Sequence, residues 1–250
     1  MTKIIAVLNH KGGVGKTTTT INLAAALQQK KKRVLLIDMD GQANLTESCG
    51  LSIEEEQTVY GAMKGEYPLP AFELGNGLSV VPSCLDLSAA ESELINEPGR
   101  ELILKGLIAK LLESRKFDYI LIDCPPSLGI VTTNAFIAAD EIIVPMTPEL
   151  LPLKGMRMLD AFVTTLQRVK PSLRLGGVFI ARFNHRKLNK VVEQAVKERY
   201  ESITMNTRIR ENIALAESAG SGKSIFEYDL NSNGAKDYLA LTEEILSRNQ

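Results

Sequence analysis

An apolar run followed at once by a glycine-rich basic loop constrains this chain more than any other feature of its sequence. The run Ile4–Leu8 has the pattern of a strand buried on both faces of a parallel sheet. The loop Lys11–Thr18 comes next, and its glycines leave backbone N–H groups free to surround an anion. A helix that begins at about Lys16 would point its positive end at the same place. Together, strand, loop and helix predict a site for a nucleoside triphosphate.

The residues of this loop have separate expected roles. Lys16 supplies a positive charge for the β- and γ-phosphates, and the hydroxyl of Thr17 is a ligand for Mg²⁺. The residues expected to bind the nucleotide are Lys11, Gly12, Gly13, Val14, Gly15, Lys16, Thr17 and Thr18. His10 stands where the common pattern has its first glycine, and a second lysine, Lys11, precedes Gly-Gly-x-Gly-Lys-Thr. This is a deviant form of the Walker A motif.

Composition indicates an ordinary soluble protein with room for one large core. The chain has 250 residues, of which 44% are hydrophobic, so we expect one domain over residues 1–250. We expect no membrane span and no signal peptide, because no apolar run reaches roughly 18 residues and the first strand begins so early. The three cysteines form no Cys-x-x-Cys pair, which favours a reducing cytoplasm. With a net charge of −1, any contact with nucleic acid needs a local basic patch.

Strand-like apolar runs alternate with helix-length segments along the chain. The expected strands are Lys3–Asn9, Arg33–Asp38, Leu78–Val81, Tyr119–Asp123, Glu141–Pro145 and Gly177–Phe183. The expected helices are Lys16–Lys30, Arg100–Ser114, Val131–Ala138, Leu153–Val169, Lys187–Arg199 and about Ala235–Ser247. This alternation predicts an α/β fold, a doubly wound and mostly parallel sheet with helices on both faces. Ligands of such sheets bind outside the carboxyl ends of the strands, where the glycine-rich loop would lie.

Acidic residues end two of these strands. Asp38 and Asp40 are two residues apart, so they would point to the same side if the strand continued. Capping of the strand end by both aspartates is the alternative. The run Tyr119–Asp123 has the Walker B arrangement, so we expect the carboxylate of Asp123 to hold Mg²⁺ against Thr17.

These motifs resemble the ParA branch of the ParA/MinD family of P-loop ATPases, and the resemblance covers nearly the whole chain. It implies that Lys11 crosses a dimer interface to the partner's nucleotide. It also implies that Asp40 positions and polarises the attacking water, with Asp38 as a structural or metal-side neighbour. The run Asp123-Cys124-Pro125-Pro126 resembles a switch that senses the γ-phosphate. Asn212 matches an asparagine that lies near the adenine. The catalytic residues would thus be Lys11, Lys16 and Asp40.

The resemblance also implies an activity and partners. The protein would be a Mg²⁺-dependent ATPase that forms an ATP-bound sandwich dimer, binds DNA nonspecifically and is switched off when a ParB-like partner stimulates hydrolysis. Such a cycle segregates a chromosome or plasmid, or positions another cargo, in the cytoplasm and on the nucleoid. The residues expected to contact DNA are Arg186, Lys187, Lys190, Arg208 and Arg210, the first three beside Arg182 and His185. Two positions depart from the family pattern, since Gly41 replaces a proline and Glu211 replaces an arginine that contributes to DNA binding.

Two other functions stay open at this point. A MinD-like ATPase would position its cargo from a membrane and would end in a basic amphipathic helix. The final helix here also contains Asp237, Glu243 and Glu244, which an anionic surface repels, so we expect no membrane partner. A scaffold that dimerises with ATP but hardly hydrolyses it would carry the same motifs.

Overall fold

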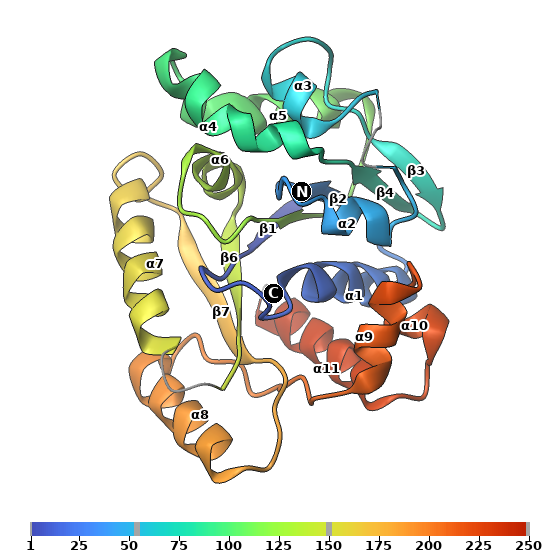
Figure 1. The fold of residues 1–250 in the computed structure, drawn as a ribbon, viewed down its shortest axis with the longest axis vertical. Coiled ribbons are helices and arrows are strands. Elements are labelled where there is room, and N and C mark those ends of the chain that lie inside the picture. The colour runs from blue at the N-terminus through green and yellow to red at the C-terminus, as the bar shows by residue number, and fades with distance from the viewer. Residues whose placement is uncertain (1, 53–55, 149–151, 249–250) are drawn as a thin grey trace.

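One seven-stranded sheet forms the centre of the structure, with its strands in the order β3-β4-β2-β5-β1-β6-β7 (Figure 1). This computed structural model describes residues 2–52, 56–148 and 152–248. The strands are β1 (Lys3–Val7), β2 (Val34–Asp38), β3 (Phe72–Gly75), β4 (Leu78–Val81), β5 (Tyr119–Asp123), β6 (Glu141–Met146) and β7 (Arg174–Ile180). Neighbouring strands pair in parallel, except that β3 and β4 are antiparallel. The predicted α/β fold with a mostly parallel sheet is confirmed.

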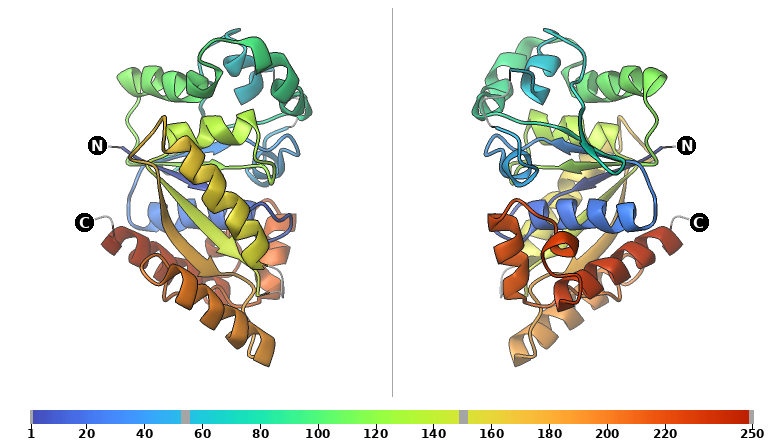
Figure 2. Two further views of the ribbon diagram at one scale, coloured as in Figure 1. Left: turned by 90° about the vertical axis from the view of Figure 1, so that its left-hand side faces the viewer. Right: turned by 90° about the vertical axis from the view of Figure 1, so that its right-hand side faces the viewer.

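Helices cover both faces of this sheet (Figure 2). The α-helices are α1 (Lys16–Gln29), α2 (Asn44–Ser48), α3 (Val59–Met63), α4 (Ala90–Glu93), α5 (Ile103–Ser114), α6 (Ile130–Ala138), α7 (Pro152–Leu166), α8 (Lys187–Tyr200), α9 (Ile213–Gly220), α10 (Ile225–Tyr228) and α11 (Asn233–Arg248). Helices α1, α9, α10 and α11 pack on one face, around Ile5 and Leu121 of the central strands. Helices α5, α6, α7 and α8 pack on the other face, around Ile120 and Ile122.

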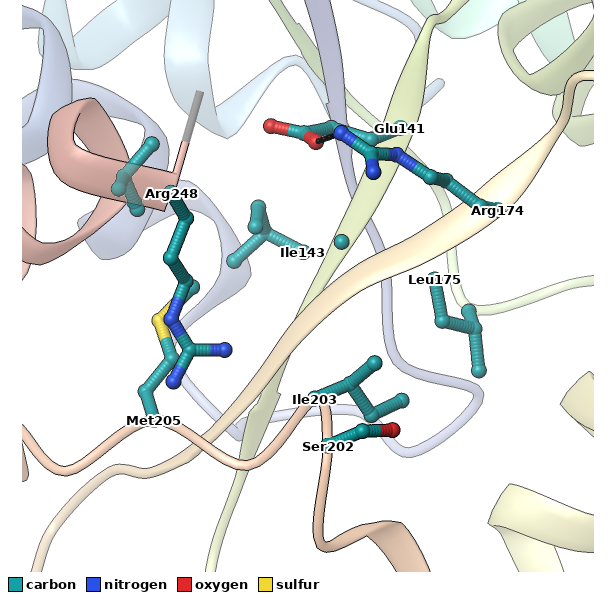
Figure 3. A pocket seen from close by; sticks show the side chains of 10 residues that line it. Glu141, Ile143, Arg174, Leu175, Ser202, Ile203, Met205 and Arg248 are labelled. Atoms are coloured by element: carbon teal, nitrogen blue, oxygen red, sulfur yellow. Dashed lines mark hydrogen bonds and ion pairs between the residues drawn. The ribbon is translucent and has the colours of Figure 1, made fainter. Parts of the chain in front are cut away.

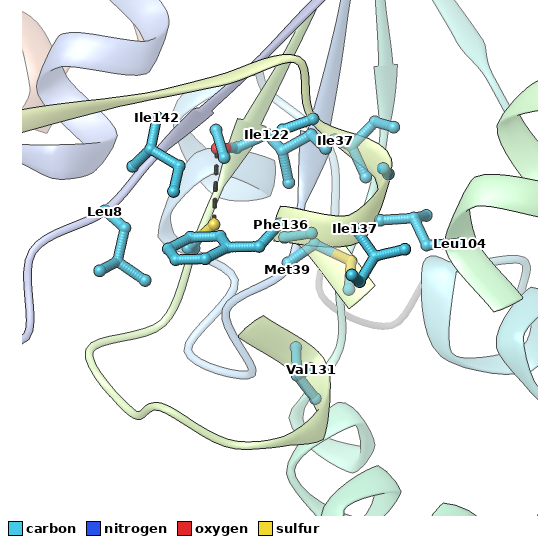
Figure 4. Packing of buried hydrophobic residues seen from close by; sticks show 14 of the residues in the cluster. Leu8, Ile37, Met39, Leu104, Ile122, Val131, Phe136, Ile137 and Ile142 are labelled. Atoms are coloured by element: carbon cyan, nitrogen blue, oxygen red, sulfur yellow. Dashed lines mark hydrogen bonds between the residues drawn. The ribbon is translucent and has the colours of Figure 1, made fainter. Parts of the chain in front are cut away.

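The two cores arise because successive side chains of a strand point to opposite faces. On the α6 face, Phe136 lies near Leu8 and Ile142 of the central strands and their loops (Figure 4). The ring of Phe136 also meets Phe162 of α7 edge to face, with ring centroids 5.7 Å apart. Every residue of β2 and β6 is buried, as expected of parallel strands covered on both sides. The sheet is thus a rigid support for the loops at its carboxyl edge.

The structure departs from the expected elements mainly at short segments. Strand β3 is an unexpected antiparallel edge strand, joined to β4 by Asn76 and Gly77, which both have positive φ. Asn-Gly is the turn pair that a tight hairpin favours, so this signal was present in the sequence. Between β4 and α5 the chain forms the short 3₁₀ helices η1 (Leu85–Ala89), η2 (Leu94–Asn96) and η3 (Arg100–Leu102) around α4. Among the described residues, no helix is both long enough and apolar enough to cross a membrane.

Candidate nucleotide and metal site

The loop between β1 and α1 is shaped to hold an anion. Gly13 and Gly15 have φ angles of 72° and 88°, a left-handed backbone that favours glycine. Gly15 is the N-cap of α1, and no side chain caps the helix there. A Cβ added at Gly12, Gly13 or Gly15 would meet no atom within 4 Å, so the space in front of the loop is open. The first N–H groups of α1 therefore face room for phosphate oxygens, as predicted.

Asp123 is the buried carboxylate of this site. It ends β5, next to β1, and is only 1% exposed. The Thr17 hydroxyl donates a hydrogen bond to Asp123 Oδ2 over 2.6 Å, and the Thr20 hydroxyl donates to Oδ1 over 3.3 Å. Burial raises the pKa of Asp123 to about 8, and the charge of Asp38 adds to the rise. A hydroxyl and a carboxylate are hard oxygen ligands, and a dication would compensate the buried charge, so Thr17 and Asp123 fit Mg²⁺.

Asp38 and Asp40 have different surroundings, because the strand does not continue between them. Strand β2 ends at Asp38, which is fully buried and lies opposite Asp123 in the register of β2 and β5. Asp38 accepts hydrogen bonds from the Thr46 N–H (2.9 Å), the Thr46 hydroxyl (2.7 Å) and the Asp40 N–H (3.1 Å). Burial raises its pKa to about 6. Of the two roles expected for Asp38, these contacts favour the structural one.

Asp40 is the more accessible carboxylate of the pair. It is half-buried, and its Oδ1 accepts a hydrogen bond from the Gln42 N–H over 3.0 Å. This bond fixes the turn that follows β2. The two aspartates do not share one side of an extended strand, and their positions come from separate hydrogen bonds.

Three contacts of the site were not expected from the sequence. The His10 Nδ1–H donates to the Pro126 carbonyl over 3.0 Å, so the residue at the replaced glycine position ties the phosphate loop to the loop after β5. Thr20 holds the second oxygen of Asp123. Thr46 holds Asp38. Only Thr20 had a clear signal, because it lies three residues after Thr17 and therefore on the same side of α1.

The other predicted residues lie in two groups. Lys11 is exposed at the front of the loop, and Asn212 is the N-cap of α9, where its side chain accepts a hydrogen bond from the Ala214 N–H over 2.9 Å. The residues expected to bind DNA are divided. Arg186, Lys187 and Lys190 are exposed on the first turns of α8.

Arg208 and Arg210 make internal ion pairs instead of standing free. Arg208 pairs with Glu193 over 2.6 Å and lies over the ring of Phe183. Arg210 holds Asp237 through both Nε and a terminal nitrogen, at 2.6 to 3.1 Å. Their side chains are still 39% and 43% exposed, so both groups remain accessible from solvent.

A second charged cavity lies at the opposite end of the sheet (Figure 3). It has a volume of about 260 Å³ and is lined by the starts of β6 and β7 and the end of α11. Glu141 is 3% exposed and forms ion pairs with Lys3 (3.3 Å) and Arg174 (3.1 Å). Arg248 enters from the other side and donates to the Thr204 carbonyl over 2.8 Å. The charged groups of this cavity have protein partners, and none of them comes from the phosphate loop.

Comparisons with known proteins agree with the geometry of the site. A protein family described as an AAA domain matches residues 2–175. The chromosome partitioning protein ParA of Myxococcus xanthus is 38% identical, over 98% of this chain and 88% of its own. The sporulation initiation inhibitor protein Soj of Bacillus subtilis is also 38% identical, over 98% of both chains. The chain belongs to the ParA family of partition ATPases.

Solved structures add the ligands of the site. A putative plasmid partition protein from Borrelia burgdorferi, bound to AMPPNP, has a TM-score of 0.84 and 28% identity, over 100% of this chain and 98% of its own. A cobyrinic acid a,c-diamide synthase from Mycobacterium smegmatis, with bound ATP analogue and magnesium, has a TM-score of 0.85 and 32% identity, over 98% and 95%. This ParA-family protein is therefore an ATPase that uses ATP and Mg²⁺. Thr17 and Asp123 would hold the Mg²⁺, which would supply positive charge against the negative charge that develops in phosphoryl transfer.

Proposed function

We propose that residues 1–250 form one ParA-like ATPase domain that dimerises face to face around ATP and binds DNA nonspecifically. A ParB-like partner would stimulate hydrolysis and so release the protein from DNA. The cycle would serve chromosome or plasmid partition, or the positioning of another cargo, in the cytoplasm and on the nucleoid. The observation that carries the proposal is an exposed basic cluster at the same end of the sheet as the nucleotide loops.

This basic cluster consists of Arg182, Arg186, Lys187 and Lys190, which are all exposed. They follow β7, which is parallel to β6, so they lie beyond the carboxyl end of the sheet. Among the described residues, none of the four has an ion-pair partner, in contrast to Arg208. Unpaired cations at one edge suit phosphates, whose contacts carry no sequence information. A dimer would present the cluster twice.

Glu211, which replaces an arginine of the family pattern, lies next to the basic cluster on α8. The Asn184 side-chain amide donates to Glu211 Oε2 over 3.1 Å, so this carboxylate lies beside the cluster. It reduces the positive charge on the side where the family usually has an arginine. Arg208 and Arg210 would then contribute at the rim of the DNA surface, through the exposed parts of their guanidinium groups.

The proposed roles in hydrolysis come from the resemblance to the ParA family, and the arrangement of the site is compatible with them. Lys16 is 8% exposed and would neutralise the β- and γ-phosphate oxygens, and Asp40 would position the attacking water. Lys11 would reach the nucleotide of the partner subunit, and Asn212 would lie near the adenine. A lysine that offsets transition-state charge across the interface is worth on the order of 10³-fold in turnover. Little covalent work falls to the protein, which suits a slow ATPase that a partner accelerates.

The last helix supports a DNA surface over a membrane surface. Tyr238 and Leu241 of α11 are buried against α1, so the apolar side of this helix is already covered. Its acidic residues hold other parts of the chain, since Asp237 pairs with Arg210 and Glu243 pairs with Lys30. An amphipathic helix that anchors a protein to lipid needs a free apolar side and a basic one.

DNA retention with ATP, with ADP and without nucleotide, across a salt series, tests the proposal. We expect binding with ATP only, and a log–log salt slope of roughly −0.9 for each phosphate contact. Arg186→Glu should weaken retention at every salt concentration and make the slope shallower. Arg168→Glu is the matched control, because this substitution changes the net charge by the same amount. Arg168 is exposed and follows the carboxyl end of α7, before β7 begins.

Lys11→Ala separates the dimer from the DNA surface in the same assay. It should bind ATP but lose ATP-dependent retention, because the dimer would not assemble. Equal retention by Arg186→Glu and wild type would refute the α8 cluster. Binding to anionic liposomes with ATP, and none to DNA, would favour the MinD-like alternative.

A further inference from the structure

The segment between β4 and α5 touches both loops that carry the catalytic carboxylates. Residues 85–93, which form η1 and α4, are called the bridging segment here. Ser88 lies against Gly41, the residue after Asp40. Three residues further on, Glu91 lies against Gly129, at the end of the loop that begins after Asp123. Both bridging side chains are exposed at the surface.

At Gly41, the Ser88 hydroxyl occupies the space that a side chain would otherwise fill. Gly41 is buried, and its φ lies outside the left-handed region, so its conformation does not demand glycine. A Cβ there would overlap Ser88 Oγ and would lie 3.4 Å from Ser88 N and 3.5 Å from the Leu85 carbonyl oxygen. Glycine at this position therefore lets the bridging segment rest directly on the loop of Asp40.

The contact at Gly129 has the same character. Glu91 Oε2 accepts a hydrogen bond from the Ile130 N–H over 2.8 Å, and Oε1 accepts one from the Val131 N–H over 3.4 Å. The carboxylate thus caps the amino end of α6, where a negative charge is favoured. A Cβ at Gly129 would collide with this carboxylate. The bridging segment thus approaches both loops at a glycine, and side-chain atoms of Ser88 and Glu91 occupy the space that a Cβ would fill.

We propose that Ser88 and Glu91 are positioning residues for ATP hydrolysis, which fix the loop of Asp40 relative to the loop of Asp123. The two residues are three apart in one short helical segment, so their separation is set by local geometry. The bridging segment would thereby keep the distance between the loop of Asp40 and the loop of Asp123 constant. This inference rests on the role proposed for Asp40 in hydrolysis and extends it to the residues that hold its loop, and it needs neither DNA nor a partner protein.

The first test separates hydrolysis from nucleotide binding. The phosphates are bound by residues 12–18, which the bridging segment does not cap, so Glu91→Ala should leave the KM for ATP within about twofold. Its kcat should fall about tenfold, as expected for the loss of a charged cap that orders a catalytic loop. Glu91→Gln keeps an acceptor and should give an intermediate kcat. Glu93→Gln is the matched control, because Glu93 is on the same segment but accepts from the Tyr60 hydroxyl over 2.7 Å.

The glycines give a second test through double variants. Gly129→Ala should lower kcat as Glu91→Ala does, and the double variant should be no slower than either, since both remove one contact. Gly41→Ala should also lower kcat, because the added Cβ would overlap Ser88 Oγ, and Ser88→Ala, which removes that contact, should lower kcat as well. Thermal unfolding of each variant identifies any loss of fold.

Specific outcomes would overturn the inference. These are an unchanged kcat in folded Glu91→Ala and Gly129→Ala, additive losses in their double variant, or an equal loss in Glu93→Gln. All rates are measured as phosphate release without DNA, so a failure of DNA retention leaves this test intact.

Discussion

Two buried carboxylates at opposite ends of the sheet meet very different surroundings. Asp123 ends β5 at the nucleotide edge and is 1% exposed, whereas Glu141 begins β6 at the far edge and is 3% exposed. Glu141 has two cationic partners, Lys3 and Arg174, within 3.3 Å. Asp123 has two hydroxyl groups and faces a second carboxylate, Asp38.

The difference shows which end of the molecule is built for a ligand. A buried charge is tolerated when the protein itself supplies the opposite charge, as it does for Glu141. At Asp123 the protein supplies two hydroxyls and the charge of Lys16, which lowers the pKa of this carboxyl by less than burial raises it. A dication such as Mg²⁺ would therefore complete the charge balance beside the open phosphate loop. Charge left uncompensated in a cavity is a mark of a functional site.

Removing a lysine at each end should give the largest contrast. Lys16→Ala takes away the charge next to the phosphates and should lower kcat on the order of 10³-fold. Lys3→Ala takes away a partner of Glu141 and should leave kcat within about twofold. Phosphate release at saturating ATP measures both. Near wild-type turnover in Lys16→Ala would contradict the assignment of the site.

Neutralising each carboxylate should change stability in opposite directions. Asp123→Asn relieves a buried charge while keeping an acceptor for Thr17, so the nucleotide-free protein should gain on the order of 2 kcal/mol at pH 8. Glu141→Gln leaves Lys3 and Arg174 without their partner and should lose about 1–2 kcal/mol, since Arg174 is partly solvated. Urea denaturation without nucleotide gives both values. A loss of stability in Asp123→Asn would remove the basis of the comparison.

The central fold could be predicted from sequence because its signals are local. Parallel strands covered on both faces are continuous apolar runs, and five of the predicted strands overlap the observed ones almost end to end. Strand β7 is shifted, beginning at Arg174 instead of Gly177 and ending at Ile180. The segments 85–96 and 213–228 were missed because they are short helices whose order depends on tertiary contacts, such as Glu91 with α6.

The parts of the site that a local sequence motif specifies could be predicted from the sequence. The glycine-rich loop and the end of β5 have such motifs, so Thr17 and Asp123 were paired correctly. The separation of Asp38 from Asp40 was not foreseen, because β2 ends where Thr46 supplies a competing hydrogen bond. The ion pairs of Arg208 and Arg210 join residues far apart in sequence, and a basic residue alone does not reveal its partner.

The smallest expected effect is a pH dependence of folding stability that arises only at the nucleotide end of the sheet. Burial raises the pKa of Asp123 from 3.8 to about 8, and that of Asp38 from 3.8 to about 6. Between pH 3.8 and 8 the folded state therefore holds more protons than the unfolded state. The stability that these two groups contribute is greatest at low pH and falls as pH rises through 8. Between pH 7 and 8 we expect a loss of about 1 kcal/mol in the nucleotide-free protein, almost all of it from Asp123.

Variants of the two carboxylates assign this pH dependence. Asp123→Asn should flatten the slope between pH 7 and 8, because its group no longer titrates, whereas Glu141→Gln should leave the slope in place. Urea midpoints at both pH values measure it. Saturating Mg²⁺ and ATP should also flatten the wild-type slope, since a dication stabilises the ionised carboxylate. If the slope were the same in Asp123→Asn and wild type, Asp123 would be compensated within the protein, as Glu141 is, and the two ends would no longer differ in kind.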